Sequence, residues 1–208
     1  MRITKATLRQ EAALLPASPD NYLCQQCQQF SKCATPFQHE IVLQPHKAAV
    51  HDRILFVTSQ PLVNSPLGMY FKKHVLKTMG LHPEQCAFVS AIACSSTKVT
   101  IAPQVEHCRA FVMRAIGHLC PVKIVLLGTD AARSVLEIKN PVLKELTGIV
   151  HRVHVCIDTK WENYPAIVTY SLAHSLRDAR VIDVIRGHIR QFVYEEMTTK
   201  EWPIMVVL

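Results

Sequence analysis

The stretch that decides the fold is VKIVLLGTD at residues 122–130. Residues 122–127 form a short, continuous apolar run, which is typical of a parallel strand buried on both faces. The Gly-Thr-Asp that follows predicts a turn into a helix over residues 131–138. A buried strand that leads directly into a helix favours an α/β domain.

The same alternation extends outward along the chain in both directions. The expected strands are residues 53–58, 86–92, 122–127, 150–157 and 166–170, and the expected helices are residues 3–15, 69–79, 103–119, 131–138 and 181–194. This order implies a mostly parallel sheet with helices on both faces. Ligands of such sheets bind at the carboxyl ends of the strands. We therefore expect residues 58–60, 90–91 and 170–171 to lie near one another at one rim.

The composition fits a single domain with a basic surface. The chain has 208 residues, 49% of them hydrophobic, which is enough apolar material for a sizeable core. Lys and Arg outnumber Asp and Glu by 23 to 16, so the formal net charge is +7. This excess suits a polyanionic partner such as nucleic acid, although many proteins without such a partner are mildly basic.

The sequence shows no sign of membrane insertion or export. No apolar run approaches the ~20 residues needed to span a bilayer. The first 20 residues lack the continuous apolar stretch of a signal peptide. We therefore expect a cytoplasmic protein without a membrane partner. In a reducing compartment, clustered cysteines are better explained by a metal centre than by disulfides.

Four of the eight cysteines form a pattern typical of a metal site. Cys24 and Cys27 form a CxxC turn before the first strand. Cys94 ends the second strand, and Cys108 lies in the helix after it. Four such thiolates hold either an iron–sulfur cluster or a tetrahedral zinc ion. Cys33 is a rival ligand because it falls in the same loop as the CxxC. The other cysteines fit ordinary small core residues. They are Cys33, Cys86, Cys120 and Cys156.

The order of these features resembles the family-4 uracil-DNA glycosylases over residues 23–192. The shared features are the CxxC, a loop with Gly-x-x-Phe at residues 68–71, the strand ending in Cys, the helix containing Cys, and the run IVLLG at residues 124–128. The resemblance implies a three-layer α/β/α fold with a central, mostly parallel four-stranded sheet. This glycosylase-like domain would cover residues 1–194, followed by a C-terminal tail at residues 195–208.

The resemblance also implies a 4Fe–4S cluster, which ranks iron–sulfur above zinc. Its ligands would be Cys24, Cys27, Cys94 and Cys108. The cluster's expected role is structural, because it would pin the N-terminal loop to the loop after the second strand.

The motif after the first strand departs from that of the family. The family motif reads Gly-Glu-x-Pro-Gly, and its acid positions or activates the hydrolytic water. Residues 58–62 read TSQPL, so Ser59 takes the place of the acid and Gln60 follows it. A hydroxyl can orient a water but deprotonates it poorly. Ser59 and Gln60 remain the candidates for holding that water.

Two further motifs are changed in the same way. Ser90 stands where the resemblance implies a base-reading asparagine, and losing paired hydrogen bonds of this kind costs specificity. Ser171 replaces the histidine of the last motif and Leu172 replaces its proline, while His174 is a candidate substitute three residues on. Phe71 matches the aromatic that stacks on the extruded base.

These observations leave two main functions open. The first is a DNA glycosylase of altered specificity, which everts an unusual or damaged base and hydrolyses its N-glycosidic bond. The second is a catalytically inactive DNA- or protein-binding subunit of a replication or repair complex. A zinc protein unrelated to DNA is a weaker third reading.

The expected contacts with partners lie at the strand ends and in the tail. Leu172 would fill the gap left in the base stack, and basic residues would hold phosphates. These basic residues are Lys72, Lys73, Lys98, Arg177 and Arg180. The apolar tail Trp202–Leu208 would dock on a partner protein, or equally would fold back on its own domain.

Overall fold

The computed structural model describes residues 53–62, 65–82, 85–93, 102–157, 160–195, 199–200 and 205–207. The strands are β1 (Ile54–Thr58), β2 (Cys86–Ser90), β3 (Lys123–Leu127), β4 (Val150–Ile157), β5 (Lys160–Thr169), β6 (Thr199–Lys200) and β7 (Met205–Val207). The helices are α3 (Pro66–Phe71), the π-helical turn η3 (Lys72–Leu76), the 3₁₀ turn η4 (Lys77–Met79), α4 (Ala102–Leu119), α5 (Thr129–Leu136), α6 (Leu143–Leu146), α7 (Leu172–Ser175) and α8 (Arg180–Tyr194). The expected helix at 3–15 lies outside the described residues.

The chain is an α/β protein with a mostly parallel sheet, as predicted. The strand order is β2-β1-β3-β5-β4-β6, and β7 also pairs with β4. The first four strands of this order run parallel, while β4 is antiparallel to β5. The sheet therefore has seven strands rather than the four that the resemblance implied.

The extra strands are β4, β6 and β7, and β4 forms a hairpin with β5 that the hydrophobic pattern did not predict in full. Only residues 166–170 were expected in the last strand, but β5 begins at Lys160. Its first half pairs with β4 from Ile157↔Lys160 to Arg152↔Pro165. That half contains a proline and several polar residues, so it does not form the apolar run by which a buried strand is predicted.

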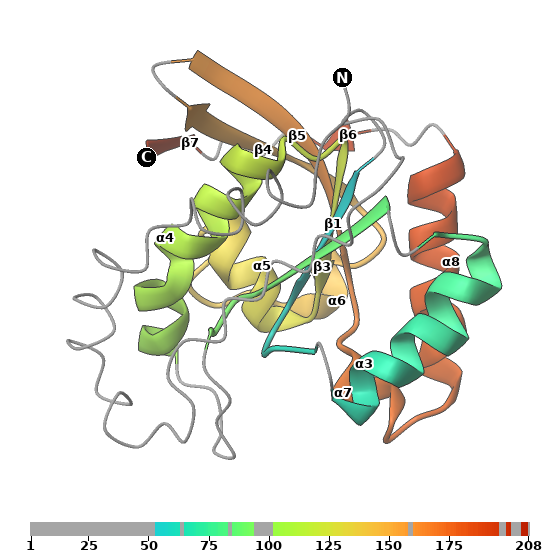
Figure 1. Cartoon of the computed structure of the whole chain (residues 1–208). Coiled ribbons are helices and arrows are strands. Elements are labelled where there is room, and N and C mark those ends of the chain that lie inside the picture. Colours follow the sequence, from blue (N-terminus) through green and yellow to red (C-terminus); the bar gives the residue numbers. More distant parts are fainter. Residues whose placement is uncertain are drawn as a thin grey trace, which may run out of the picture.

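Helices cover both faces of the sheet (Figure 1). α4 and α5 lie on one side, and α3 and α8 lie on the other. Alternate residues of each strand point to opposite faces, so Leu55 and Val57 pack in the core beneath α4 and α5. Phe56 packs in the second core with Ile185 of α8. The three-layer arrangement follows from this alternation.

The segment from Pro66 to Met79 is one irregular helix that ends at Gly80. Ser65 caps its start by accepting a hydrogen bond from the Gly68 N–H at 3.0 Å. Gly80 adopts a left-handed conformation at φ +69°, which confirms the predicted end of the helix. The helix begins before residue 69, where it was expected, because Ser65 and Pro66 form a start signal.

Hydrogen bonds join α8 to this helix and to the sheet. Side chains of α8 donate to carbonyls of the irregular helix, and a side chain of β3 donates to the last carbonyls of α8. Arg186 donates to the His74 carbonyl at 2.7 Å, and Tyr194 donates to the Met79 carbonyl at 2.8 Å. The Lys123 ammonium at the start of β3 donates to the carbonyls of Phe192 and Val193 at 2.6 and 2.9 Å. These carbonyls lie in the last turn of α8 and have no partner within the helix.

The described part of the C-terminal tail belongs to this chain's own sheet. Met205–Val207 pairs in parallel with His154–Cys156 of β4. For these three residues the structure shows the fold-back alternative rather than a free docking segment. Trp202 lies outside the described residues.

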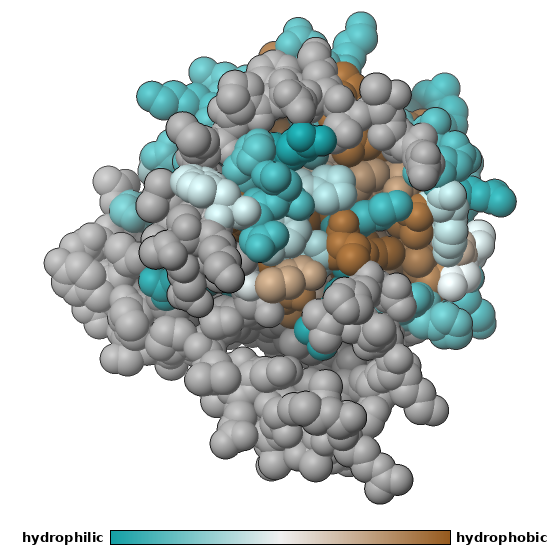
Figure 2. Space-filling model, turned by 90° about the horizontal axis from the view of Figure 1, so that it is seen from above, coloured by the Kyte–Doolittle hydropathy of each residue, from teal (hydrophilic) through white to brown (hydrophobic). Residues whose placement is uncertain are grey.

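The surface carries scattered apolar residues, and no membrane-crossing helix is found in the described chain. None of the described helices is both long and apolar enough to span a bilayer. On the face seen in Figure 2, a group of apolar residues reaches the surface among hydrophilic ones. The large apolar residues that are exposed in the described segments are Met69, Val122, Val142, Trp161, Leu176, Val184 and Tyr194.

Candidate functional site

The carboxyl ends of the four parallel strands lie at one edge of the sheet, which we call the carboxyl edge. It comprises residues 58–62, 90–93, 128 and 170–177. Hydrogen bonds continue the pairing of β1 and β2 past their ends: Ala91 N–H donates to the Thr58 carbonyl at 2.7 Å, and Ile92 N–H donates to the Ser59 carbonyl at 3.1 Å. The loops that carry Ser59 and Ser90 are therefore held side by side.

Gly128 joins the other half of this edge. Its N–H donates to the Thr169 carbonyl at 2.9 Å. It adopts φ +98°, and a Cβ built on it would lie 2.7 Å from the Cβ of Ser171. Only glycine allows the loop after β5 to approach the end of β3 so closely. The predicted placement of the strand ends is confirmed on both sides of β3: the loop after β1 lies on one side and the loop after β5 on the other.

The three serines of this edge have different surroundings. Ser59 and Ser171 are half-buried, whereas Ser90 is only 5% exposed and lies opposite Thr58 in the β1–β2 register. The Ser171 hydroxyl accepts a hydrogen bond from the His174 N–H at 3.3 Å and so caps α7. These groups can orient a water or a ligand, but a hydroxyl is not a base near neutral pH.

Gln60 and His174 complete the expected polar set. Gln60 is half-buried, and its backbone carbonyl accepts a hydrogen bond from the Thr58 hydroxyl at 2.7 Å. His174 is half-buried, and its ring meets that of Tyr170 edge to face at 5.4 Å. Thr58 thus fixes the loop that carries Ser59 and Gln60, and Tyr170 orients the imidazole on the neighbouring loop.

Phe71 and Leu172 lie in the core rather than at the surface. Phe71 has no exposed area and packs edge to face on Phe56 at 5.4 Å and on Phe88 at 6.0 Å. Leu172 is 3% exposed, because it begins the short helix α7 on the side that faces the core. Leu172 therefore does not project from the edge, as a residue that enters the base stack would have to do.

Leu176 is an exposed apolar residue of this edge that was not among the predicted site residues. It is 65% exposed and lies just beyond α7, next to the exposed Arg177. Because α7 is a single turn, residues 172 and 176 do not share its buried side once the chain leaves the helix. The sequence shows a leucine beside an arginine at residues 176–177, but only the position of α7 shows that Leu176 is exposed and Leu172 is buried.

The expected basic residues do not form one patch. Arg177 is exposed on the loop after α7. Arg180 is exposed, but its guanidinium donates twice to Asp178 at 3.0 Å, and this contact lowers the pKa of that carboxyl. Lys72 and Lys73 lie on the helix before β2 and line a different groove. Lys98 lies outside the described residues.

A histidine that was not expected lies just inside the carboxyl edge. Thr169 ends β5 and is fully buried, and its hydroxyl lies 2.9 Å from Nδ1 of His188 in α8. Burial lowers the pKa of His188. Nothing in the local sequence marks this pair, because His188 lies among polar residues of α8 and its partner is distant in the chain.

One of the four expected cluster ligands lies in the described part. The Cys108 side chain is 6% exposed and packs with Ala93 and Phe111. Ala93 is the residue before Cys94 in the sequence, so α4 brings Cys108 to the exit of β2. Cys94 itself, with Cys24 and Cys27, lies outside the described residues. Across the described segments, no group of three or more His, Cys, Asp or Glu side chains is arranged to hold a metal ion.

The other cysteines are only partly as expected. Cys86 is a buried core residue, and burial raises the pKa of its thiol to about 12. Cys120 is exposed, contrary to expectation, because it lies in a left-handed turn at φ +43° after α4. Its thiol donates to the Gly117 carbonyl at 3.1 Å. Cys33 and the side chain of Cys156 lie outside the described residues.

Comparison with known proteins adds no family. No protein-family model matches the chain, and a search of curated proteins finds no match.

Proposed function

We propose that this chain is an iron–sulfur, glycosylase-like protein that binds DNA at its carboxyl edge. The observation that carries the proposal is the arrangement of this edge. Four parallel strands end together there, and the loops after β1 and β5 bring Ser59 and Ser171 to either side of β3. A site between parallel strand ends suits a small planar group such as an everted base.

The loop after α7 supports DNA as the partner. Leu176 is an exposed leucine with no described core around it, and Arg177 beside it carries a permanent positive charge. An apolar side chain can fill the gap left by an everted nucleotide, while an arginine holds a phosphate. In this proposal Leu176 takes the role that the sequence reading gave to Leu172.

The buried Cys108 supports the cluster. A thiol at the exit of β2, enclosed by Ala93 and Phe111, fits a ligand that joins this loop to another part of the chain. Cys24, Cys27, Cys94 and Cys108 would hold a 4Fe–4S cluster, with zinc as the alternative for the same four thiolates. The bound cluster would supply a cross-link between the N-terminal loop and the loop after β2.

Hydrolysis, if the protein is an enzyme, would depend on weakly basic groups. Ser59 and Gln60 would hold a water, and the His174 imidazole would stabilise negative charge on the departing base. The substrate would then be an unusual or damaged base with a labile N-glycosidic bond, because no carboxylate stands in the described part of the edge to activate the water.

A second candidate is a binding subunit without catalysis. Its support is that the Ser171 hydroxyl already accepts the His174 N–H and that Ser90 is buried beside Thr58. Side chains used in this way hold the loops in place. The same edge would then recognise distorted or single-stranded DNA in a repair or replication assembly.

One set of measurements tests the proposal and separates its two forms. Protein purified without oxygen should be brown, with a broad absorbance band near ~400 nm. Binding to duplex and single-stranded oligonucleotides should weaken steeply with salt, and Arg177→Glu should reduce the salt dependence by roughly one phosphate contact. Lys144→Glu, an exposed charge reversal in α6, is the control.

Each outcome of these measurements supports one form of the proposal or removes a part of it. Release of a base from DNA that contains uracil or a panel of modified bases supports the enzyme, and binding without release supports the subunit. Colourless protein that contains zinc would remove the iron–sulfur part. Equal binding by the Arg177→Glu protein and the unmodified protein would remove the carboxyl edge as the DNA site.

A further inference from the structure

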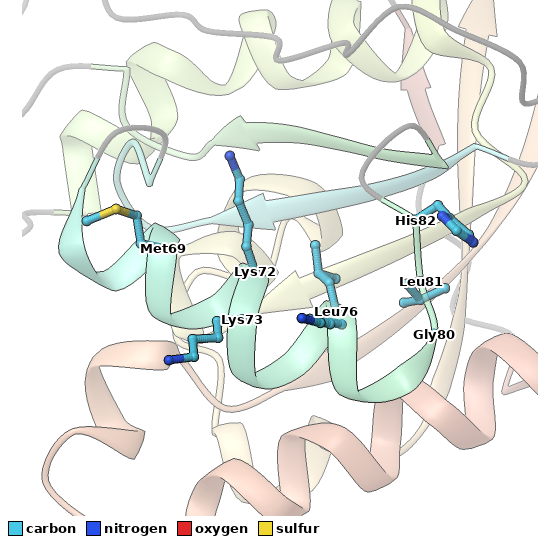
Figure 3. A pocket seen from close by; sticks show the side chains of 8 residues that line it. Met69, Lys72, Lys73, Leu76, Gly80, Leu81 and His82 are labelled. Atoms are coloured by element: carbon cyan, nitrogen blue, oxygen red, sulfur yellow. The ribbon is translucent and has the colours of Figure 1, made fainter.

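A groove with a basic rim runs along the outer side of the helix before β2 (Figure 3). Its volume is about 490 Å³, and Lys72, Lys73, Lys77 and His82 stand around it. Lys72 and Lys73 leave the helix in different directions, so their charges flank the groove instead of meeting at one point. None of the residues that line this groove is acidic.

Apolar side chains lie beneath the groove and at one end of it. Leu76 and Leu81 are almost fully buried, and Leu76 points inward toward the sheet. Met69 lies at one end and is 62% exposed, which is high for a large apolar side chain. Methionine is flexible and polarisable, and it is over-represented at surfaces that bind peptides. The groove thus combines an apolar base with cations that have no carboxylate partner among its walls.

The backbone of this wall is also unusual. Lys72–Leu76 is a π-helical turn and Lys77–Met79 a 3₁₀ turn, so two irregular turns follow one another. A π-helical turn is rare and occurs frequently at functional sites, whereas a 3₁₀ turn is a common way for a helix to end. Here they form the length of helix from which the lysines project.

We propose that this groove binds an amphipathic, acidic peptide segment of a partner protein. Apolar side chains of the peptide would lie against the exposed Met69, above the buried Leu76 and Leu81. Its carboxylates would face Lys72, Lys73 and Lys77. Charge complementarity favours an anion. None of the described residues that line the groove is Phe, Tyr or Trp, which disfavours a single strand of nucleic acid, whose bases bind by stacking.

The groove is separate from the carboxyl edge. It reaches Leu81 and His82, which precede β2, whereas the edge consists of the loops that follow the strands. Lys72 and Lys73, which the sequence reading assigned to DNA, line this groove and not the loop of Arg177. Peptide binding therefore does not depend on the proposed function.

Fluorescence anisotropy with a defined probe tests the inference. The probe is a fluorescein-labelled helical peptide with leucines at i, i+4 and i+7 and glutamates at its other exposed positions. We expect saturable binding that Lys72→Glu/Lys77→Glu weakens by roughly tenfold or more, because two attractive contacts become repulsive. Lys144→Glu should leave the affinity unchanged, and so should Arg177→Glu. Circular dichroism checks that each variant is folded.

Two results would overturn the inference. One is equal affinity of the double variant and the unmodified protein for the peptide. The other is single-stranded DNA that competes for the groove and loses affinity in the double variant while the peptide does not. As a control, a probe with lysines in place of its glutamates should not bind, because its charges would face Lys72, Lys73 and Lys77.

Discussion

Replacing Gly128 by alanine tests the contact that builds the carboxyl edge. Gly128 adopts φ +98° and ψ −179°, a conformation that is essentially restricted to glycine. A Cβ at this position would also lie 2.7 Å from the Cβ of Ser171. The methyl group must therefore be accommodated by moving either the end of β3 or the loop after β5.

The loss of stability in Gly128→Ala follows from the backbone conformation of Gly128 and from its close contact with Ser171. A non-glycine residue in this backbone region costs about 1–3 kcal/mol. Inserting a methyl group against packed atoms costs about 1–3 kcal/mol more. We expect Gly128→Ala to lower the free energy of unfolding by about 2–6 kcal/mol in total. For a domain of this size, the melting temperature should fall by roughly 5–20 °C.

Two other glycines serve as matched controls in a urea or thermal unfolding series. Gly80 has φ +69° with nothing within 4 Å of an added Cβ, so Gly80→Ala should cost only about 1 kcal/mol. Gly187 lies within α8 and also has open space around it, so Gly187→Ala should stabilise by about 0.5–1 kcal/mol. If Gly128→Ala were no more destabilising than Gly80→Ala, the close approach of the two loops would be refuted.

Three further substitutions test other parts of the structure. Lys123→Met removes the ammonium that donates to the last carbonyls of α8; because Lys123 is partly exposed, the free energy of unfolding should fall by only about 1 kcal/mol, measured by urea titration. Burial lowers the pKa of His188, so the folded state disfavours protonation of its ring. Neutral His188 is compatible with the fold above its unfolded pKa of about 6.5, and the protein loses stability as the pH falls below that value. His188→Asn should therefore lose less stability than the unmodified protein between about pH 7.5 and about pH 5, and an equal loss in both would contradict the assignment. Cys108→Ser should abolish the absorbance band near ~400 nm in protein purified without oxygen, whereas Cys86→Ser should retain it.

Much of the fold could be predicted because burial leaves a direct trace in the sequence. The runs that became β1, β2 and β3 are buried, except for Lys123 at the start of β3, so each contains a block of apolar residues. The end of the helix at Gly80 was predictable because a left-handed residue favours glycine. These features depend on a few neighbouring residues.

Features that depend on distant partners could not be predicted in this way. The first half of β5 is a strand because it pairs with β4, although it contains Pro165 and polar residues. Which of Leu172 and Leu176 faces the core is decided by where a single helical turn begins. Cys120 is exposed because the chain turns at that residue, a property that its apolar neighbours do not reveal.

The irregular helix from Pro66 to Met79 has an inner side that packs in the core and an outer side that forms the groove. Its inner side supplies Phe71 and Leu76 to the core, and its outer side carries the lysines. From behind, Arg186 and Tyr194 of α8 donate to the carbonyls of His74 and Met79, where the π and 3₁₀ turns disturb the regular ladder. These bonds fix the groove wall to α8, whereas the carboxyl edge is fixed by Gly128 and by the bonds between the ends of β1 and β2. Because different contacts hold the two surfaces, we infer that a peptide in the groove and DNA at the edge bind independently, and that each affinity stays the same when the other ligand is saturating.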